Sequence, residues 1–160
     1  MGEFSEFSLP VRALLRAYRW RRIDPVPWAP LEKPLAKCRL AIVSSAGFVL
    51  RDQQPFDDSV RGGDISFREI PNDVDVSELV DTHRSESFDH TGLCRDPNLA
   101  FPLDRMREMV ESGRVRSLAR AHLSFMGSIT APGRLVRDTA PEAANSLVDD
   151  CVDVALLVPV

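Results

Sequence analysis

The C-terminal part of the chain constrains the fold most, because a helix signal there leads directly into a strand signal. The segment "TAPE" has the form of a capping box, with Thr139 as the N-cap and Glu142 three residues later. Apolar residues then recur at helical spacing over residues 143–148. Residues 152–158 follow at once, and their mostly apolar character predicts a buried strand. A helix that runs straight into such a strand predicts a mostly parallel sheet.

Upstream segments predict the other elements. Residues 40–43 form a short apolar run with β-branched side chains, and residues 65–70 and 121–125 are two further strand candidates. Residues 103–110 carry an apolar stripe that Gly113 is well placed to end as a helix. The polar stretch 88–102 is predicted to be a loop. We therefore expect an α/β fold, a mostly parallel sheet with helices on both faces, of the Rossmann or flavodoxin type.

The N-terminal region differs from the rest. Residues 8–22 predict a basic amphipathic helix, which either contacts a membrane or a partner or, as we favour, packs on its own domain or a second subunit. The next stretch contains four prolines, which favour an extended strap. We expect residues 1–37 to form this helix and strap, and residues 38–160 to form the α/β domain.

Charge and cysteine content exclude several classes of protein. The formal net charge of −4 gives no global field for nucleic acid or acidic membranes. The apolar runs are too short for a membrane span, and Glu3 and Glu6 do not suit a secretory signal. Three cysteines without a CxxC spacing exclude a disulfide framework and a zinc ribbon. The protein is expected to be cytoplasmic, with a small-molecule substrate rather than nucleic acid or membrane as its target.

The histidines do not predict a metal site. His83, His90 and Cys94 have no standard zinc spacing and lack an evident fourth ligand, so neither a metal nor a cofactor is expected. His122 alternates with apolar residues and is expected to be structural.

The first strand is followed by the residues expected to bind substrate. In open parallel sheets, ligands bind beyond the carboxyl ends of the strands. Ser44, Ser45 and Gly47 lie at that end of the first strand, and offer hydroxyl and backbone N–H groups to a carboxylate or phosphate. The alternative is a plain turn with local serine hydrogen bonds.

Four segments together resemble a known family. They are "PVPWAPLEKPLAKCRLAIVSSAG", "FDHTG", "DPNLAFPLDRMREMVESGRV" and the terminal "ALLVPV". They resemble the protein B subunit family of glycine, sarcosine, betaine and D-proline reductases, and look closest to its short bacterial members. The resemblance implies an oxidoreductase that cleaves a small amino-acid-like substrate reductively, working with partner reductase subunits or as a homo-oligomer.

The resemblance also implies a reactive residue that the chain does not contain. In the family, the strand equivalent to residues 156–160 is followed by a selenocysteine or cysteine, with a second cysteine three positions later. Selenocysteine is encoded by UGA, which is ordinarily a stop codon. We expect the position after Val160 to be selenocysteine, which would make the chain a truncated selenoprotein with an incomplete domain; the downstream DNA tests this.

Asp89, His90 and Thr91 are the catalytic candidates that the resemblance implies. His90 is expected either to donate a proton or to hold the selenolate as an ion pair. The alternative is a turn in which Asp89 binds the backbone and His90 is half exposed. Two other functions stay open: a non-catalytic partner subunit, and an α/β module that binds a small molecule through Ser44, Ser45 and Asp89.

Overall fold

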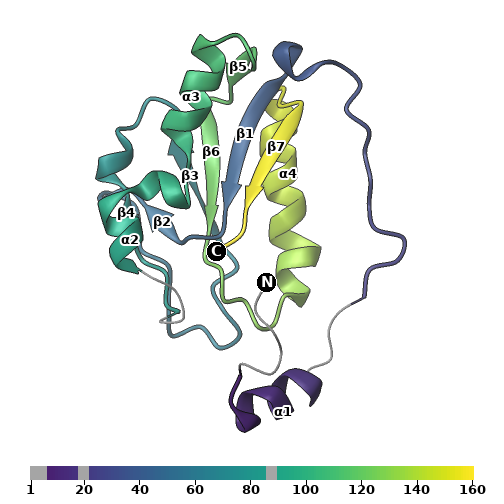
Figure 1. Cartoon of the computed structure of the whole chain (residues 1–160), viewed down its shortest axis with the longest axis vertical. Helices are drawn as coiled ribbons and strands as arrows, with labels where there is room; N and C mark the ends of the chain where they lie inside the picture. The colour runs from purple at the N-terminus through teal and green to yellow at the C-terminus, as the bar shows by residue number, and fades with distance from the viewer. Residues whose placement is uncertain (1–6, 18–21, 86–89) are drawn as a thin grey trace. The chain divides into compact units, whose positions relative to one another are not determined.

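The structure, a computed structural model, describes residues 7–17, 22–85 and 90–160 (Figure 1). The chain divides into two compact units, Met1–Pro30 and Leu31–Val160. The first unit contains helix α1 (Leu9–Ala17), which confirms a helix in the predicted region. Its predicted continuation falls partly on residues 18–21, which lie outside the described part.

In its described residues, the second unit contains a central sheet, a two-stranded sheet and three α-helices. Its strands are β1 (Arg39–Ser44), β2 (Phe48–Val49), β3 (Phe67–Pro71), β4 (Val80–Asp81), β5 (Ser117–Leu118), β6 (Ala121–Phe125) and β7 (Val154–Val158). Its α-helices are α2 (His90–Arg95), α3 (Leu103–Glu111) and α4 (Ala140–Asp149).

Strand β1 lies at the centre of the main sheet. It pairs in parallel with β7 from Leu40 opposite Val154 to Ser44 opposite Val158. On its other side β1 pairs in parallel with β5 and then with β6. Strand β3 is antiparallel to β6, and β2 and β4 form a separate antiparallel pair.

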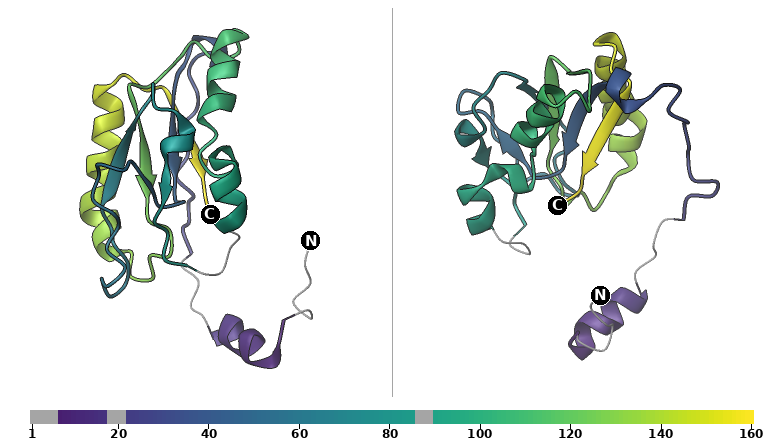
Figure 2. Two further views of the ribbon diagram at one scale, coloured as in Figure 1. Left: turned by 90° about the vertical axis from the view of Figure 1, so that its left-hand side faces the viewer. Right: turned by 45° about the horizontal axis from the view of Figure 1, so that its top comes forward.

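Helices cover both faces of the main sheet. Helices α2 and α3 lie on one face and α4 on the other (Figure 2). The core therefore includes central-strand residues with no solvent contact, such as Ala41 and Ile42, and side chains from the helical layer, such as Phe101 and Leu103. The predicted α/β class, with a mostly parallel sheet between helices, is confirmed. Within the described ranges, no helix combines the length and apolarity that a bilayer crossing requires.

Two predicted elements match closely. Strand β6 spans the predicted residues, and α3 uses the predicted stripe, with Met106, Met109 and Val110 packed against the core. Gly113 ends α3 as expected: it adopts φ +71°, its N–H donates to Val110 O at 2.9 Å, and Arg114 N–H donates to Met109 O at 2.9 Å. A left-handed residue at this position is the usual C-terminal cap.

The predicted capping box at Thr139 is wrong. Thr139 has helical backbone angles, φ −75° and ψ −39°, and its side chain makes no capping hydrogen bond. The reason is that a π-helical turn, Leu135–Thr139, precedes α4, so that Ala140 N–H already donates to Leu135 O. A side-chain cap serves only where the backbone enters the helix from an extended conformation.

The last strand begins later and is less buried than predicted. The residues after α4 are taken up by its C-terminal turn, in which Cys151 has φ +55° and Val152 N–H donates to Leu147 O at 2.9 Å. Strand β7 then pairs only with β1 among the described residues, and its side chains alternate between partly buried and exposed. Leu157 is 68% exposed. The prediction of a buried strand is therefore wrong for these outward-facing positions.

The stretch 88–102 is not only a loop, as was predicted. Residues His90–Arg95 form helix α2, and Pro97–Leu99 form a single 3₁₀ turn. Helix α2 contains Gly92 and is only six residues long, so the spacing of apolar residues does not reveal it. Leu93 is buried in the core and anchors the helix. Tertiary packing therefore stabilises a helix that local propensity alone does not indicate.

Candidate functional site

The carboxyl ends of β1, β6 and β7 meet around one residue, Ser45. Ser45 N–H donates to Val158 O at 3.1 Å, and Val160 N–H donates to the Ser45 hydroxyl at 2.9 Å. From the other side, Gly127 N–H donates to Ser45 O at 2.8 Å. Ser45 thus joins the ends of all three strands, at the edge where parallel sheets bind ligands.

A cavity of about 540 Å³ opens at this edge, and we call it the strand-end cavity. Its walls come from the ends of β1, β6 and β7, from the loop after β6, and from the start of the α4 region. The lining residues are Val43, Ser44, Ser45, Phe125, Met126, Gly127, Ser128, Ile129, Leu135, Ala140, Leu157, Val158, Pro159 and Val160.

Ser44 and Gly47, the other two predicted substrate-binding residues, have internal partners. The Ser44 hydroxyl donates to Ala100 O at 2.7 Å and accepts from Ala46 N–H at 3.1 Å. Gly47 adopts φ +70°, and its N–H donates to Phe125 O at 2.8 Å. An added Cβ at Gly47 would lie 3.0 Å from the backbone of His83, so this position needs glycine.

His83 is a central residue of this region, which sequence reasoning considered only as a possible metal ligand and rejected in that role. Its buried ring packs against Gly127, where an added Cβ would lie 2.5 Å from the ring Nε2. Ser85 N–H donates to Nδ1 at 3.1 Å, so the neutral ring carries its proton on Nε2. Burial is the main cause that lowers the pKa of His83; Asp81 opposes it, while His90 and Arg84 add to the lowering. The ring is therefore neutral at pH 7.

His90 lies in the first turn of α2, and its ring is hydrogen-bonded to Asp81. Its Nδ1 contacts Asp81 Oδ2, and its Nε2 donates to Ser85 O at 2.7 Å. Because Ser85 O can only accept, Nε2 is the donor of that hydrogen bond, and the contact of Nδ1 with Asp81 fixes the orientation of the ring. The His83 ring centre lies 6.5 Å from that of His90, and Asp81 Oδ1 accepts from the His83 backbone N–H at 2.9 Å. Asp81 thus contacts the ring of His90 and the backbone of His83.

Of the predicted catalytic residues Asp89, His90 and Thr91, the structure describes His90 and Thr91. Asp89 lies outside the described residues, and Thr91 is exposed in the first turn of α2. Neither His90 nor Thr91 is among the residues that line the strand-end cavity. The structure therefore brings Ser44 and Ser45 to the cavity and His90 to Asp81.

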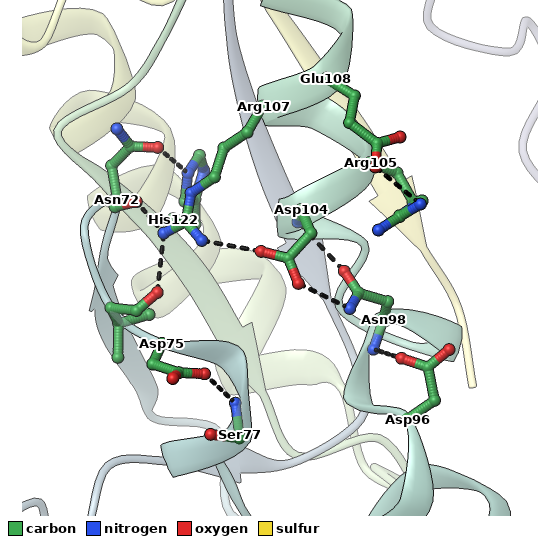
Figure 3. Close-up of polar contacts among 11 residues, drawn as sticks. Asn72, Asp75, Ser77, Asp96, Asn98, Asp104, Arg105, Arg107, Glu108 and His122 are labelled. Carbon is green, nitrogen blue, oxygen red and sulfur yellow. Dashed lines mark hydrogen bonds and ion pairs between the residues drawn. The ribbon is translucent and has the colours of Figure 1, made fainter.

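His122 is structural, as predicted. Its ring is fully buried, and its Nδ1 accepts from Ile42 N–H at 3.0 Å. Its Nε2 faces Asn72 Oδ1 at 3.3 Å (Figure 3). Burial lowers the pKa of His122 to about 4, with a further contribution from Arg107 and an opposing one from Asp150. Arg107 donates to the carbonyls of Asn72 and Val74, so this network ties α3 to the end of β3.

The described residues contain no group of three or more histidine, cysteine or acidic side chains that could hold a metal ion. Cys94 and Cys151 are exposed, and Cys38 is buried with its thiol 3.4 Å from Pro34 O. None of the three lines the strand-end cavity. The described chemistry at the cavity is therefore that of hydroxyls and apolar groups.

Comparison with known sequences now places the chain. The family model described as glycine/sarcosine/betaine reductase selenoprotein B matches residues 15–159. The chain belongs to this family. The selenoprotein B match therefore confirms the resemblance from the sequence, and it spans β1, β6, β7, His83 and His90 alike.

Two curated proteins are similar to this chain, and both are longer than it. It is 33% identical over 136 residues to a protein named D-proline reductase subunit gamma from Acetoanaerobium sticklandii, covering 84% of this chain and 54% of the relative. It is 28% identical over 134 residues to one named sarcosine reductase complex component B subunit beta from Peptoclostridium acidaminophilum, covering 84% of this chain and 30% of the relative. The chain thus spans about half or less of each relative. No solved structure matches.

Proposed function

We propose that the chain is a component of a reductase complex that cleaves a small amino-acid-like substrate, with the reactive centre at the tip of β7. The observation that carries this proposal is the junction of β1, β6 and β7 at Ser45, beside the strand-end cavity. The names of the two relatives, each a reductase subunit, support it. Because both relatives are named as subunits, we also propose that this chain works with partner subunits.

The reactive group in this proposal is a selenocysteine or cysteine at the position after Val160. An ordinary thiol, with a pKa of about 8.5, is mostly protonated at neutral pH, which favours the more acidic selenol as nucleophile. The selenolate forms an Se–C bond as the substrate C–N bond breaks and the amine leaves with a proton. A nearby cysteine thiolate then forms an S–Se bond, and the released carbon takes up a proton. An external dithiol reduces the selenide-sulfide and supplies the two electrons.

His90 and Asp81 supply the proton in this scheme. A histidine ring that is oriented by a carboxylate suits a general acid. Asp89 and Thr91 adjoin His90 in the chain, and we assign them to its positioning. Ser45 supports the reactive residue at the end of β7, while Ser44 and Gly47 fix Ser45 through their own internal hydrogen bonds.

Turnover by the complete gene product tests the proposal. The protein, with the residue after Val160 as selenocysteine, cysteine or alanine, is combined with its partner subunits, a dithiol, and D-proline or sarcosine. Alanine should abolish turnover, and His90→Asn should reduce kcat by about 10²-fold or more. Cys94→Ser and Cys151→Ser are matched controls and should retain activity. Undiminished turnover with alanine would exclude the proposed centre.

A second candidate is a module that binds a small molecule without catalysis. The specific observation in its favour is that the cavity lining contains no described cysteine, histidine or acid. The same experiment separates the two, because a binding module retains ligand affinity and shows no turnover with any residue at the tested position.

A further inference from the structure

Strand β7 is an edge of the main sheet as far as the chain is described. It pairs with β1 on one side, and no described strand lies against its other side. Val158 O accepts from Ser45 N–H, so every second residue of the strand directs its backbone groups toward β1. The N–H and C=O groups of Ala155 and Leu157 therefore point to the open side.

The amino-acid sequence of β7 is that of an interior strand. Residues 154–158 read VALLV, with no charged side chain and no proline. Natural edge strands usually carry charges, prolines or bulges, which prevent further strands from pairing with them. Because β7 has neither charge nor proline, its open side is suited to the addition of one more strand.

On one face of β7 the side chains are also uncovered. The register places Ala155 beside Ala41 and Leu157 beside Val43, so these four side chains share a face of the sheet. Leu157 lines the strand-end cavity together with Ala140, so this is the face that α4 covers. Ala41 has no solvent contact, whereas Ala155 is exposed and Leu157 is 68% exposed. Helix α4 thus covers β1 on this face and leaves β7 open.

Helix α4 itself presents an exposed apolar row. Ala140, Ala144 and Val148 are spaced four residues apart, so they lie on one side of the helix. All three are exposed, and Val148 is 68% exposed. Ala140 lines the cavity together with Leu157, so the row lies on the side of α4 nearest β7. We call this row, with Ala155 and Leu157, the β7 flank.

The connection between β6 and β7 determines on which face a further helix would lie. The chain passes from β6 through α4 to β7, and these two parallel strands lie on opposite sides of β1 (Figure 1). Crossovers between parallel strands are almost always right-handed. A strand added outside β7 continues in the same direction across the sheet, so its crossover helix lies on the same face as α4. The β7 flank is exposed on that face.

We propose that the part of the gene product that follows Val160 completes this sheet: a helix covers the β7 flank, and a parallel strand pairs with the open side of β7. The proposal rests on the proposed function, in which the chain continues past Val160. The curated relatives have room for such a segment, because the matches cover only 54% and 30% of their lengths. The covering helix begins close to the residue after Val160, where a helix N-terminus lowers the pKa of a thiol or selenol.

Hydrogen exchange tests the added strand in two proteins. One is the 160-residue chain. The other is the gene product extended to its natural stop codon, with alanine at the position after Val160. The amides of Ala155 and Leu157 should exchange at least about 100-fold more slowly in the extended protein, because they gain hydrogen-bond partners there.

Thermal melts of the same two proteins test the covering helix. Val148→Asp should lower the Tm of the extended protein by about 5 °C or more, because it buries a charge, and should hardly change the Tm of the 160-residue chain. Leu99→Asp is the matched control: Leu99 is 66% exposed and lies beside α2 and α3, on the other face of the sheet (Figure 2). Its effect should be equally small in both proteins.

The proposal is overturned if the amides of Ala155 and Leu157 exchange equally fast in both proteins, or if Val148→Asp shifts both Tm values equally. Protection of these amides already in the 160-residue chain would assign the open side to a second copy, and also overturns it. So does an open reading frame after Val160 of fewer than about 20 residues, which is too short for a helix and a strand. Because alanine replaces the proposed reactive residue, these results do not depend on turnover and are distinguishable from a failure of the reductase function.

Discussion

Gly127 leaves space for its neighbours because glycine has no Cβ atom. Any Cβ at this position would lie 2.5 Å from His83 Nε2 and 2.8 Å from Ser45 O. His83 is held by Ser85 and Asp81 and has little room to move. We therefore expect Gly127→Ala to lower the free energy of unfolding by about 1–3 kcal/mol, measured by urea denaturation.

Gly133→Ala provides the control for this prediction. Gly133 lies in the helical turn before α4, and an added Cβ there meets no atom within 4 Å. Alanine at a helical glycine should stabilise the protein by up to about 1 kcal/mol. Equal effects of the two substitutions would show that the contact of Gly127 with His83 has no steric consequence.

His122 makes stability depend on pH in a defined window. The buried ring is neutral because its pKa is lowered to about 4, whereas an unfolded histidine titrates near 6.5. Between these values only the unfolded chain takes up the proton, so stability falls as pH decreases from about 6.5 to 4, by about 3 kcal/mol in all. Urea denaturation across this range should show the slope in wild type. His122→Gln should remove it; an unchanged slope would assign the effect to another group.

At the level of elements, one carboxylate attaches the end of α4 to the sheet. Asp150 accepts from Arg120 N–H and Arg120 Nε, both at 2.6 Å, and lies 3.4 Å from the Arg39 guanidinium. Burial acts to raise the pKa of Asp150, but these hydrogen bonds and charges lower it overall. Its stabilising effect is thus present above the unfolded pKa of about 3.9 and is lost below it.

Asp150→Asn should therefore lower the free energy of unfolding at pH 7 by about 1–3 kcal/mol. Asp149→Asn is the matched control, because Asp149 is the exposed neighbour and should change the stability by less than about 0.5 kcal/mol. Urea denaturation of both variants at pH 7 gives the comparison. Similar losses for both would place the effect in the helix terminus rather than in the contacts of Asp150.

Elements with a strong local pattern were predictable, and those made by tertiary contacts were not. The stripe of α3 and its end at Gly113 follow from spacing and backbone freedom, which are local properties. Helix α2 and the antiparallel direction of β3 depend on what packs against them, and periodicity carries no such information. The apparent capping box failed because a residue pattern does not report the backbone conformation that precedes it.

The same distinction holds for the site: the position of Ser45 was predictable from the sequence, and the role of His83 was not. The rule for parallel sheets places Ser45 at the strand ends, where the structure has it. His83 escaped notice because its role arises from contacts with Gly47 and Gly127, which are distant in sequence. The only available signal was a glycine shortly after each of two strands.

The whole molecule combines two units whose contributions to stability should differ. The residues of the hydrophobic core, and those packed against it, begin at Leu35 and continue to Val158. Leu35 and the ion pair between Lys33 and Asp153, 2.7 Å long, belong to the unit Leu31–Val160 rather than to the helix-bearing unit. The boundary that we propose from sequence, after residue 37, would separate these residues from the domain they pack on.

Two truncations test where the stable domain begins. Removing residues 1–30 should change the free energy of unfolding by less than about 1 kcal/mol, because none of the described residues in this segment belongs to the hydrophobic core. Removing residues 1–37 also deletes Leu35, whose burial contributes about 1–2 kcal/mol, and the chain that covers the Cys38 thiol. The shorter protein should therefore be less stable by about 2 kcal/mol in urea denaturation. Equal stability of the two would support the boundary after residue 37, and a large loss on removing residues 1–30 would show that the first unit is needed to stabilise the second.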